Sequence, residues 1–136
     1  MNRYKPSSEA EQSYAADLAL AGRHAELLDA AGEAETEFRQ AQADRAPDAE
    51  LRRLALALDS ALTDAMRAAY AVQRAEIGVR GYDDRIYRRK AKAKPHIHAL
   101  TADAERLLTL RENHRLNDIP AVTFEPSPAT AQISKA

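Results

Sequence analysis

The sequence predicts an all-α protein built around a long helical hairpin. Apolar side chains between residues 51 and 77 recur every three or four positions, which places them on one side of an α-helix. Alanine, the strongest helix former, supplies about half of the 45% hydrophobic content. Proline and glycine fall between the periodic segments, where they end helices. We therefore expect a hairpin of helices over about 9–45 and 47–77, completed into a small bundle by a third helix over about 96–116.

The length of 136 residues fits one domain with a modest core, and we assign residues 1–116 to it. Residues 117–136 read as an extended or flexible tail, because they contain three prolines and no helical period. The absence of cysteine excludes disulfides, thiol nucleophiles and thiolate metal sites. No run approaches the roughly 20 apolar residues of a membrane span, so we expect no membrane contact and a cytoplasmic location.

The first helix is expected to start at a capping box, with Ser8 as the cap and Glu11 reaching back to it. Two apolar stripes follow along this helix. The early stripe is Tyr14, Leu18, Ala21, Ala25, Leu28 and Gly32, and the later one is Ala31, Ala34, Phe38 and Ala41. We therefore expect either a kink near Gly32 or contact with two neighbours. A bend or a close backbone contact is expected at Gly22 or Gly32, since glycine weakens a helix interior.

The second helix should begin at Pro47, because proline is favoured at a first helical position, and end before Gly78. A short basic helix over 82–94 should follow, starting at an acidic pair, Asp83 and Asp84. Tyr82 and Ile86 look like anchors for it. Pro95 separates this segment from the third helix.

Charge is unevenly distributed although the net charge is only −1. Residues 1–46 carry 5 basic and 9 acidic side chains, and residues 78–100 carry 7 basic and 2 acidic ones. The basic segment is the strongest functional lead, because cations spaced along one helix face can contact successive phosphates. The candidate nucleic-acid-binding residues are Arg80, Arg85, Arg88, Arg89, Lys90, Lys92 and Lys94. The alternative is a solvated face, or a strip that docks on the acidic first helix of this or another copy.

Catalytic and metal-binding patterns are weak. His96 and His98 are two residues apart and point to different sides of a helix, so we expect no metal site and no cofactor. The segment from Arg89 to His96 resembles the arginine-to-histidine spacing of the HEPN ribonuclease-like domains. That resemblance would imply proton transfer by His96 and phosphate contact by Arg89. It departs from the family in the lysine after Arg89 and the proline before His96, and it covers eight residues.

We therefore expect a non-enzymatic helical adaptor, scaffold or structural subunit that acts through protein–protein contacts. A small alanine-rich core buries little area, which favours a protein partner or self-association. Proteins of this style occur in phage, mobile-element and secretion assemblies. The tail would supply Phe124 and Ile133 as partner-binding residues. The alternative is a nucleic-acid-binding accessory protein that uses residues 80–94, and the remote alternative is a HEPN-like ribonuclease.

Overall fold

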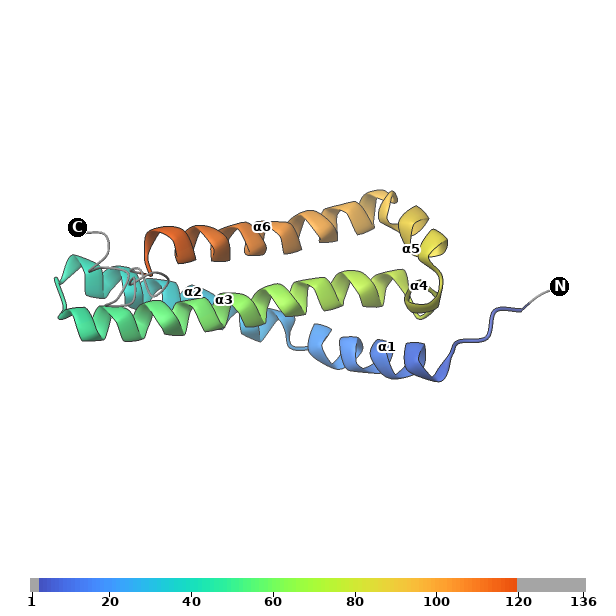
Figure 1. Ribbon diagram of the computed structural model, residues 1–136, viewed down its shortest axis with the longest axis horizontal. Helices are drawn as coiled ribbons and strands as arrows, with labels where there is room; N and C mark the ends of the chain where they lie inside the picture. The colour runs from blue at the N-terminus through green and yellow to red at the C-terminus, as the bar shows by residue number, and fades with distance from the viewer. Residues whose placement is uncertain (1–2, 120–136) are drawn as a thin grey trace, which may run out of the picture.

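The computed structural model describes residues 3–119, and within them the protein is all-α, as predicted. Six helices follow one another: α1 (Ser8–Ala21), α2 (His24–Ala43), α3 (Asp48–Ile77), α4 (Arg80–Asp83), α5 (Arg85–Lys92) and α6 (Pro95–Asn117). Figure 1 shows α3 running the length of the molecule, with α6 above it, α1 below it and α2 passing behind it. The short helices α4 and α5 connect α3 to α6 at one end.

Helix α3 is the centre of the bundle because its apolar arc faces two sets of neighbours. It packs on α1, α2 and α6, so the predicted division between the first and third helices is confirmed. The main core contains many alanines, which let the helices approach closely: Ala31, Phe38, Leu54, Ala55, Leu58, Leu62, Ala65, Ala69, Ala104 and Leu107. A second cluster beneath α5 contains Ile77, Ala91 and Ile97.

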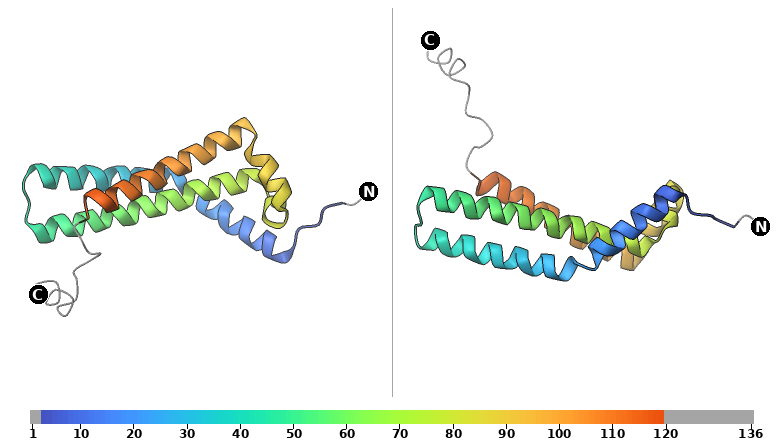
Figure 2. Two further views of the ribbon diagram at one scale, coloured as in Figure 1. Left: turned by 45° about the horizontal axis from the view of Figure 1, so that its top comes forward. Right: turned by 90° about the horizontal axis from the view of Figure 1, so that it is seen from below.

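The first predicted helix is two helices. It breaks at Gly22 and Arg23, and α1 and α2 run in different directions (Figure 2). Of the two alternatives, the kink near Gly32 is not observed, and of the two glycines it is Gly22 that lies at the bend. Gly32 sits in the interior of α2 with no side-chain neighbour within 4 Å of the position that a Cβ would occupy. Nothing around Gly32 forces a bend, so the helix continues through it.

The inner stripe of these helices also differs from the prediction. The later stripe is inward, and both Ala31 and Phe38 are buried. On the early stripe, however, Leu18 and Leu28 are 48% and 42% exposed. The change of direction after α1 separates the two halves, and α2 presents only one narrow stripe to α3. Part of the early stripe is consequently uncovered by the described chain.

The cap of α1 is Ser7 rather than Ser8. The Ser7 hydroxyl accepts a hydrogen bond from the Ala10 N–H at 3.0 Å. In a capping box, the side chain of the third helical residue accepts a hydrogen bond from the backbone N–H of the cap residue. Here the Ser7 N–H donates instead to the Asp83 carboxylate at 2.8 Å. A carboxylate from α4 therefore replaces the local glutamate that the sequence suggested.

The remaining boundaries agree closely with expectation. Pro47 immediately precedes α3, and the turn before it places Arg45 at a φ of 53°. The basic segment is divided into α4 and α5, since Asp84 is extended and caps α5. Helix α6 begins at Pro95 and ends at Asn117, one residue longer at each end than predicted. Ile119 packs against the core, and the predicted tail residues Phe124 and Ile133 lie outside the described residues.

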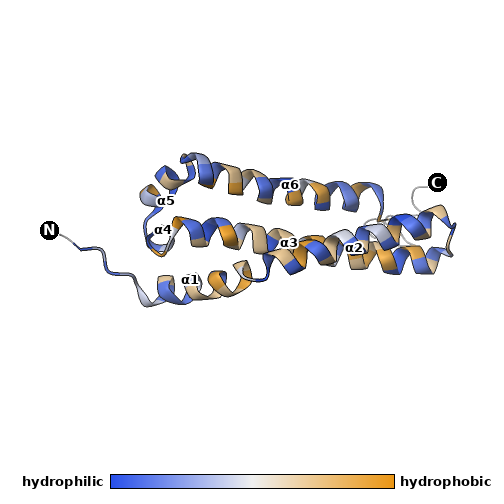
Figure 3. Ribbon diagram, turned by 180° about the vertical axis from the view of Figure 1, so that it is seen from behind, coloured by the Kyte–Doolittle hydropathy of each residue, from blue (hydrophilic) through white to orange (hydrophobic). Residues whose placement is uncertain are grey.

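Hydropathy varies around each helix rather than along it. Figure 3 shows hydrophilic and hydrophobic residues interleaved on the long helices. Between residues 3 and 119, no helix is long and apolar enough to cross a membrane.

Candidate partner-binding surface

The basic segment forms the end of the molecule where the chain turns from α3 into α6. Two glycines make this turn. Gly78 ends α3 with a φ of 99°, a left-handed value that glycine adopts without strain. Gly81 is buried, and a Cβ there would lie 2.7 Å from Cγ2 of Ile77. The close approach of α4 to the end of α3 therefore depends on this glycine.

Helix α5 is fixed by a local polar cap. The Asp84 carboxylate accepts from the Tyr87 N–H at 3.0 Å, and this bond, helped by Arg80, holds the pKa of Asp84 below its usual value. The Arg80 guanidinium carbon lies 4.9 Å from the ring centre of Tyr87 and 5.4 Å from that of Tyr4. Arg80 is therefore held between two aromatic rings and a carboxylate.

The N-terminal segment is tied to the same end through Asp83. This carboxylate accepts from the Tyr4 hydroxyl at 2.5 Å, the Ser7 N–H at 2.8 Å and the Ser7 hydroxyl at 2.5 Å. The hydrogen bonds from Ser7, followed by the one from Tyr4, keep the pKa of Asp83 below its usual value. Because the partners are more than 75 residues apart in sequence, the contact joins the start of α1 to α4.

A second carboxylate, Asp17, joins α1 to α3 and α4. Arg74 binds it through two nitrogens, with Nε at 2.7 Å and Nη2 at 3.1 Å, and the Tyr82 hydroxyl donates to it as well. Partial burial alone would raise the pKa of Asp17, but the hydrogen bonds from Arg74 and Tyr82 outweigh it and the pKa is lowered. Burial and the bond to Asp17 raise the pKa of Tyr82. The surface of α5 is thus mounted on a cross-linked support.

The structure separates the seven predicted cations into two groups. Arg80 is held by the contacts above, and Arg88 donates from Nη1 to the Gly81 carbonyl at 3.0 Å, so both serve the turn itself. The other five are exposed and form no ion pair with any residue between 3 and 119. We call these five residues the basic end: Arg85, Arg89, Lys90, Lys92 and Lys94.

Ile86 is not the anchor that the sequence suggested, because its side chain is 68% exposed. Tyr87 and Ala91 pack on the second core cluster in its place, whereas Tyr82 does anchor the segment through Asp17. On the helix surface, Ile86 is a neighbour of Arg89 and Lys90, at spacings of three and four residues. The basic end therefore includes cations on either side of an exposed aliphatic side chain.

The histidines near this end make no cluster. His96 lies at the start of α6 with Nε2 3.8 Å from Oε1 of Glu76, and both side chains are exposed. Arg89, its partner in the HEPN-like spacing, is exposed on α5. Among residues 3–119, no group of three His, Cys, Asp or Glu side chains is placed to hold a metal ion.

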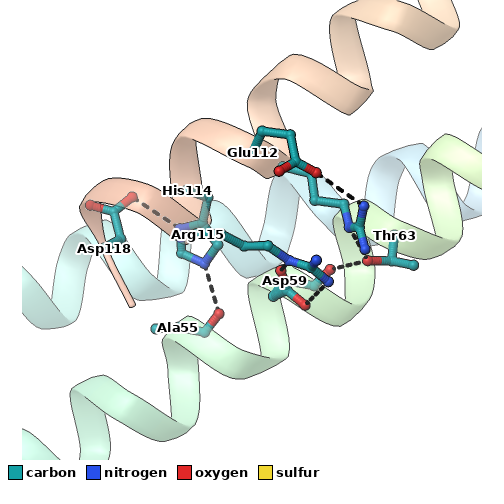
Figure 4. A network of polar contacts seen from close by, with 8 residues as sticks. Ala55, Asp59, Thr63, Glu112, His114, Arg115 and Asp118 are labelled. Atoms are coloured by element: carbon teal, nitrogen blue, oxygen red, sulfur yellow. Dashed lines mark hydrogen bonds and ion pairs between the residues drawn. The ribbon is translucent and has the colours of Figure 1, made fainter. Parts of the chain in front are cut away.

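A second polar cluster lies toward the other end of α6, around His114 (Figure 4). The His114 ring is only 4% exposed. Its Nε2 lies 2.7 Å from the Ala55 carbonyl and its Nδ1 lies 2.9 Å from the Asp118 carboxylate. Each ring nitrogen of His114 therefore faces a hydrogen-bond acceptor.

The His114 ring belongs to a network that binds α6 to α2 and α3. Burial would raise the pKa of Asp118, but hydrogen bonds from Arg39 and His114 outweigh it and lower the pKa. Asp59 on α3 accepts from Arg115 at 2.6 and 3.2 Å, and this contact lowers its pKa (Figure 4). The Phe38 and His114 rings pack edge-on, with their centroids 5.5 Å apart. The cluster is a structural clamp between three helices.

Comparison of the chain with family models, curated proteins and solved structures finds no match.

Proposed function

We propose that the protein is a non-catalytic helical scaffold or structural subunit that works through protein–protein contacts in a larger assembly. The observation that carries the proposal is the basic end. Its five cations lack ion-pair partners in the described chain, two of them neighbour the exposed Ile86, and a support fixed by Asp17, Asp83 and Asp84 holds them in place.

Such a surface suits a protein partner for two reasons. An aliphatic side chain within a charged ring resembles a small interface, with an apolar centre and a polar rim. Prior ordering of α5 reduces the entropy that binding would otherwise cost. The support thereby serves binding as well as folding.

The test is site-specific photo-crosslinking of the full chain in its native cells. A photoreactive residue in place of Ile86 should capture protein. The matched control is the same residue in place of Leu56, which is exposed on α3 away from the basic end. Protein adducts at position 86 and few at position 56 support the proposal. Equal yields at the two positions, or none at position 86, contradict it.

Nucleic acid is the second candidate for the same surface. Arg85, Arg89 and Lys92 recur about once per turn on the exposed side of α5, a spacing that suits successive phosphates. In this case a DNA or RNA oligonucleotide should bind with an affinity that falls steeply as salt rises. Replacing Arg85 and Arg89 with alanine should weaken binding, whereas Arg67→Ala on the exposed side of α3 should not. Unchanged binding after the first pair of substitutions rejects this candidate.

A further inference from the structure

We infer that the partner of the basic end is a second copy of this chain, and that it docks on the outer face of α2. This inference rests on the proposed function, because it names the protein that the basic end contacts. Four acidic side chains define the receiving surface, which we call the acidic face: Glu26, Asp29, Glu33 and Glu37.

The acidic face is an unpartnered side of a helix. Helix α2 turns Ala31, Ala34 and Phe38 toward the interior, and the acidic residues, spaced three or four apart, lie on its exposed flank. At one end of this flank, Glu37 borders a groove that it shares with Arg53 of α3. All four are exposed. Glu26 pairs with Arg23 at 2.5 Å, whereas the other three form no ion pair with any residue between 3 and 119.

The two surfaces match in charge and in length. The basic end carries five positive charges and the acidic face four negative ones. At 1.5 Å per residue, Glu26 to Glu37 spans about 16 Å and Arg85 to Lys92 about 10 Å, so α5 fits along the acidic face. Complementary charges of this kind orient partners and speed their association.

The apolar positions match as well. On α2, the exposed Ala30 lies four residues after Glu26, three before Glu33 and seven before Glu37. These spacings place a small side chain among the carboxylates. Ile86 has the corresponding place among the cations of α5. Docking would bury Ile86 against Ala30 within a ring of ion pairs.

One chain cannot make this contact with itself. Helix α5 lies at the end where α3 meets α6, and α2 lies in the other half of the molecule (Figure 1). The contact must therefore join two copies. The contact is heterologous, because it joins two different surfaces. In a pair of copies, one copy therefore keeps a free basic end and the other a free acidic face, and further copies can add until a ring closes or a filament forms.

Charge reversal tests the contact. One variant carries Arg85→Glu, Arg89→Glu and Lys92→Glu, and the other carries Asp29→Lys, Glu33→Lys and Glu37→Lys. All six positions are exposed and lie outside both core clusters, and circular dichroism verifies that each variant folds. Sedimentation velocity then measures self-association of each variant and of their equimolar mixture at low salt.

We expect the wild type to associate, and each variant alone to associate about tenfold more weakly or not at all. The mixture should regain assembly, because it restores opposite charges at both kinds of contact. A mixture that stays monomeric overturns the inference, and so does a variant that associates like the wild type. Assembly that requires added nucleic acid and disappears with nuclease also overturns it, in favour of the second candidate.

The two proposals fail separately. If position 86 captures a different protein while the pure chain stays monomeric, the second copy is wrong and the scaffold function stands. If position 86 captures no protein, the scaffold function itself is wrong.

Discussion

Replacing His114 with alanine should destabilise the protein more than any other single histidine substitution. The ring nitrogens lie within hydrogen-bond distance of the Ala55 carbonyl and the Asp118 carboxylate, and the ring packs edge-on against Phe38. A neutral hydrogen bond contributes about 1 kcal/mol and one to a charged group about 1.5–3 kcal/mol. The aromatic contact adds about 0.5–1.5 kcal/mol. Arg39 still pairs with Asp118 in the variant, which limits the loss.

The expected decrease in the free energy of unfolding is therefore about 2–4 kcal/mol, a large share of the roughly 5–15 kcal/mol of a typical domain. Urea unfolding followed by far-ultraviolet circular dichroism measures it directly, since the described chain is helical and the sequence has no tryptophan. The matched control is His98→Ala, at an exposed position of the same helix. Both substitutions replace histidine with alanine, so both increase helix propensity by the same amount. A loss below about 1 kcal/mol for His114→Ala, or an equal loss in the control, would refute the clamp.

Three further predictions concern the glycines, the N-terminal tie and acid. Gly32→Ala should stabilise the protein by about 0.5–1 kcal/mol, because the added Cβ meets no neighbour. Gly81→Ala should destabilise it by about 1–3 kcal/mol, because the added Cβ meets Ile77. Urea unfolding that changes the unfolding free energy in the same direction for both variants contradicts this. Asp83→Ala should speed amide hydrogen exchange at the start of α1, because Ser7 loses its hydrogen bonds to Asp83, while α6 stays protected. Unchanged exchange at the start of α1 would show that Asp83 does not stabilise it. Acid should destabilise the fold. Carboxylates whose pKa is lowered in the folded state contribute their full stabilisation above the unfolded aspartate pKa of about 3.9. That stabilisation disappears as the pH falls through their pKa values in the folded state. The unfolding free energy should thus fall below about pH 4, and a constant value down to pH 3 would contradict the role of Asp17, Asp59 and Asp118.

Local signals in the sequence predicted the central helix α3 and the third predicted helix, α6. The apolar arc of α3, the proline before it and the proline at the start of α6 are local signals, and the structure confirms each of them. The break in the first helix was ambiguous because Gly22 and Gly32 carry the same propensity penalty. Only the surroundings distinguish them, since Gly32 lies in open space within a continuous helix.

The support of the basic end could not be predicted in the same way. Asp83 and Asp17 bind partners 57 to 79 residues away, and nothing in their local sequence indicates those partners. The sequence identified the seven cations, but it did not predict that Arg80 and Arg88 form contacts within the turn. The spacing of four residues between His114 and Asp118 at the end of α6 was a usable signal for their contact. The Ala55 carbonyl that completes it depends on tertiary packing.

We propose that this chain works through protein contacts made by its basic end, first of all with its own copies. Sedimentation velocity of the wild-type chain over a range of concentrations, at low and at high salt, tests it most directly. We predict that assemblies grow with concentration at low salt and dissociate to the 15.0 kDa monomer at high salt. A 15.0 kDa monomer at every concentration and salt, with no protein captured at position 86, would contradict the account.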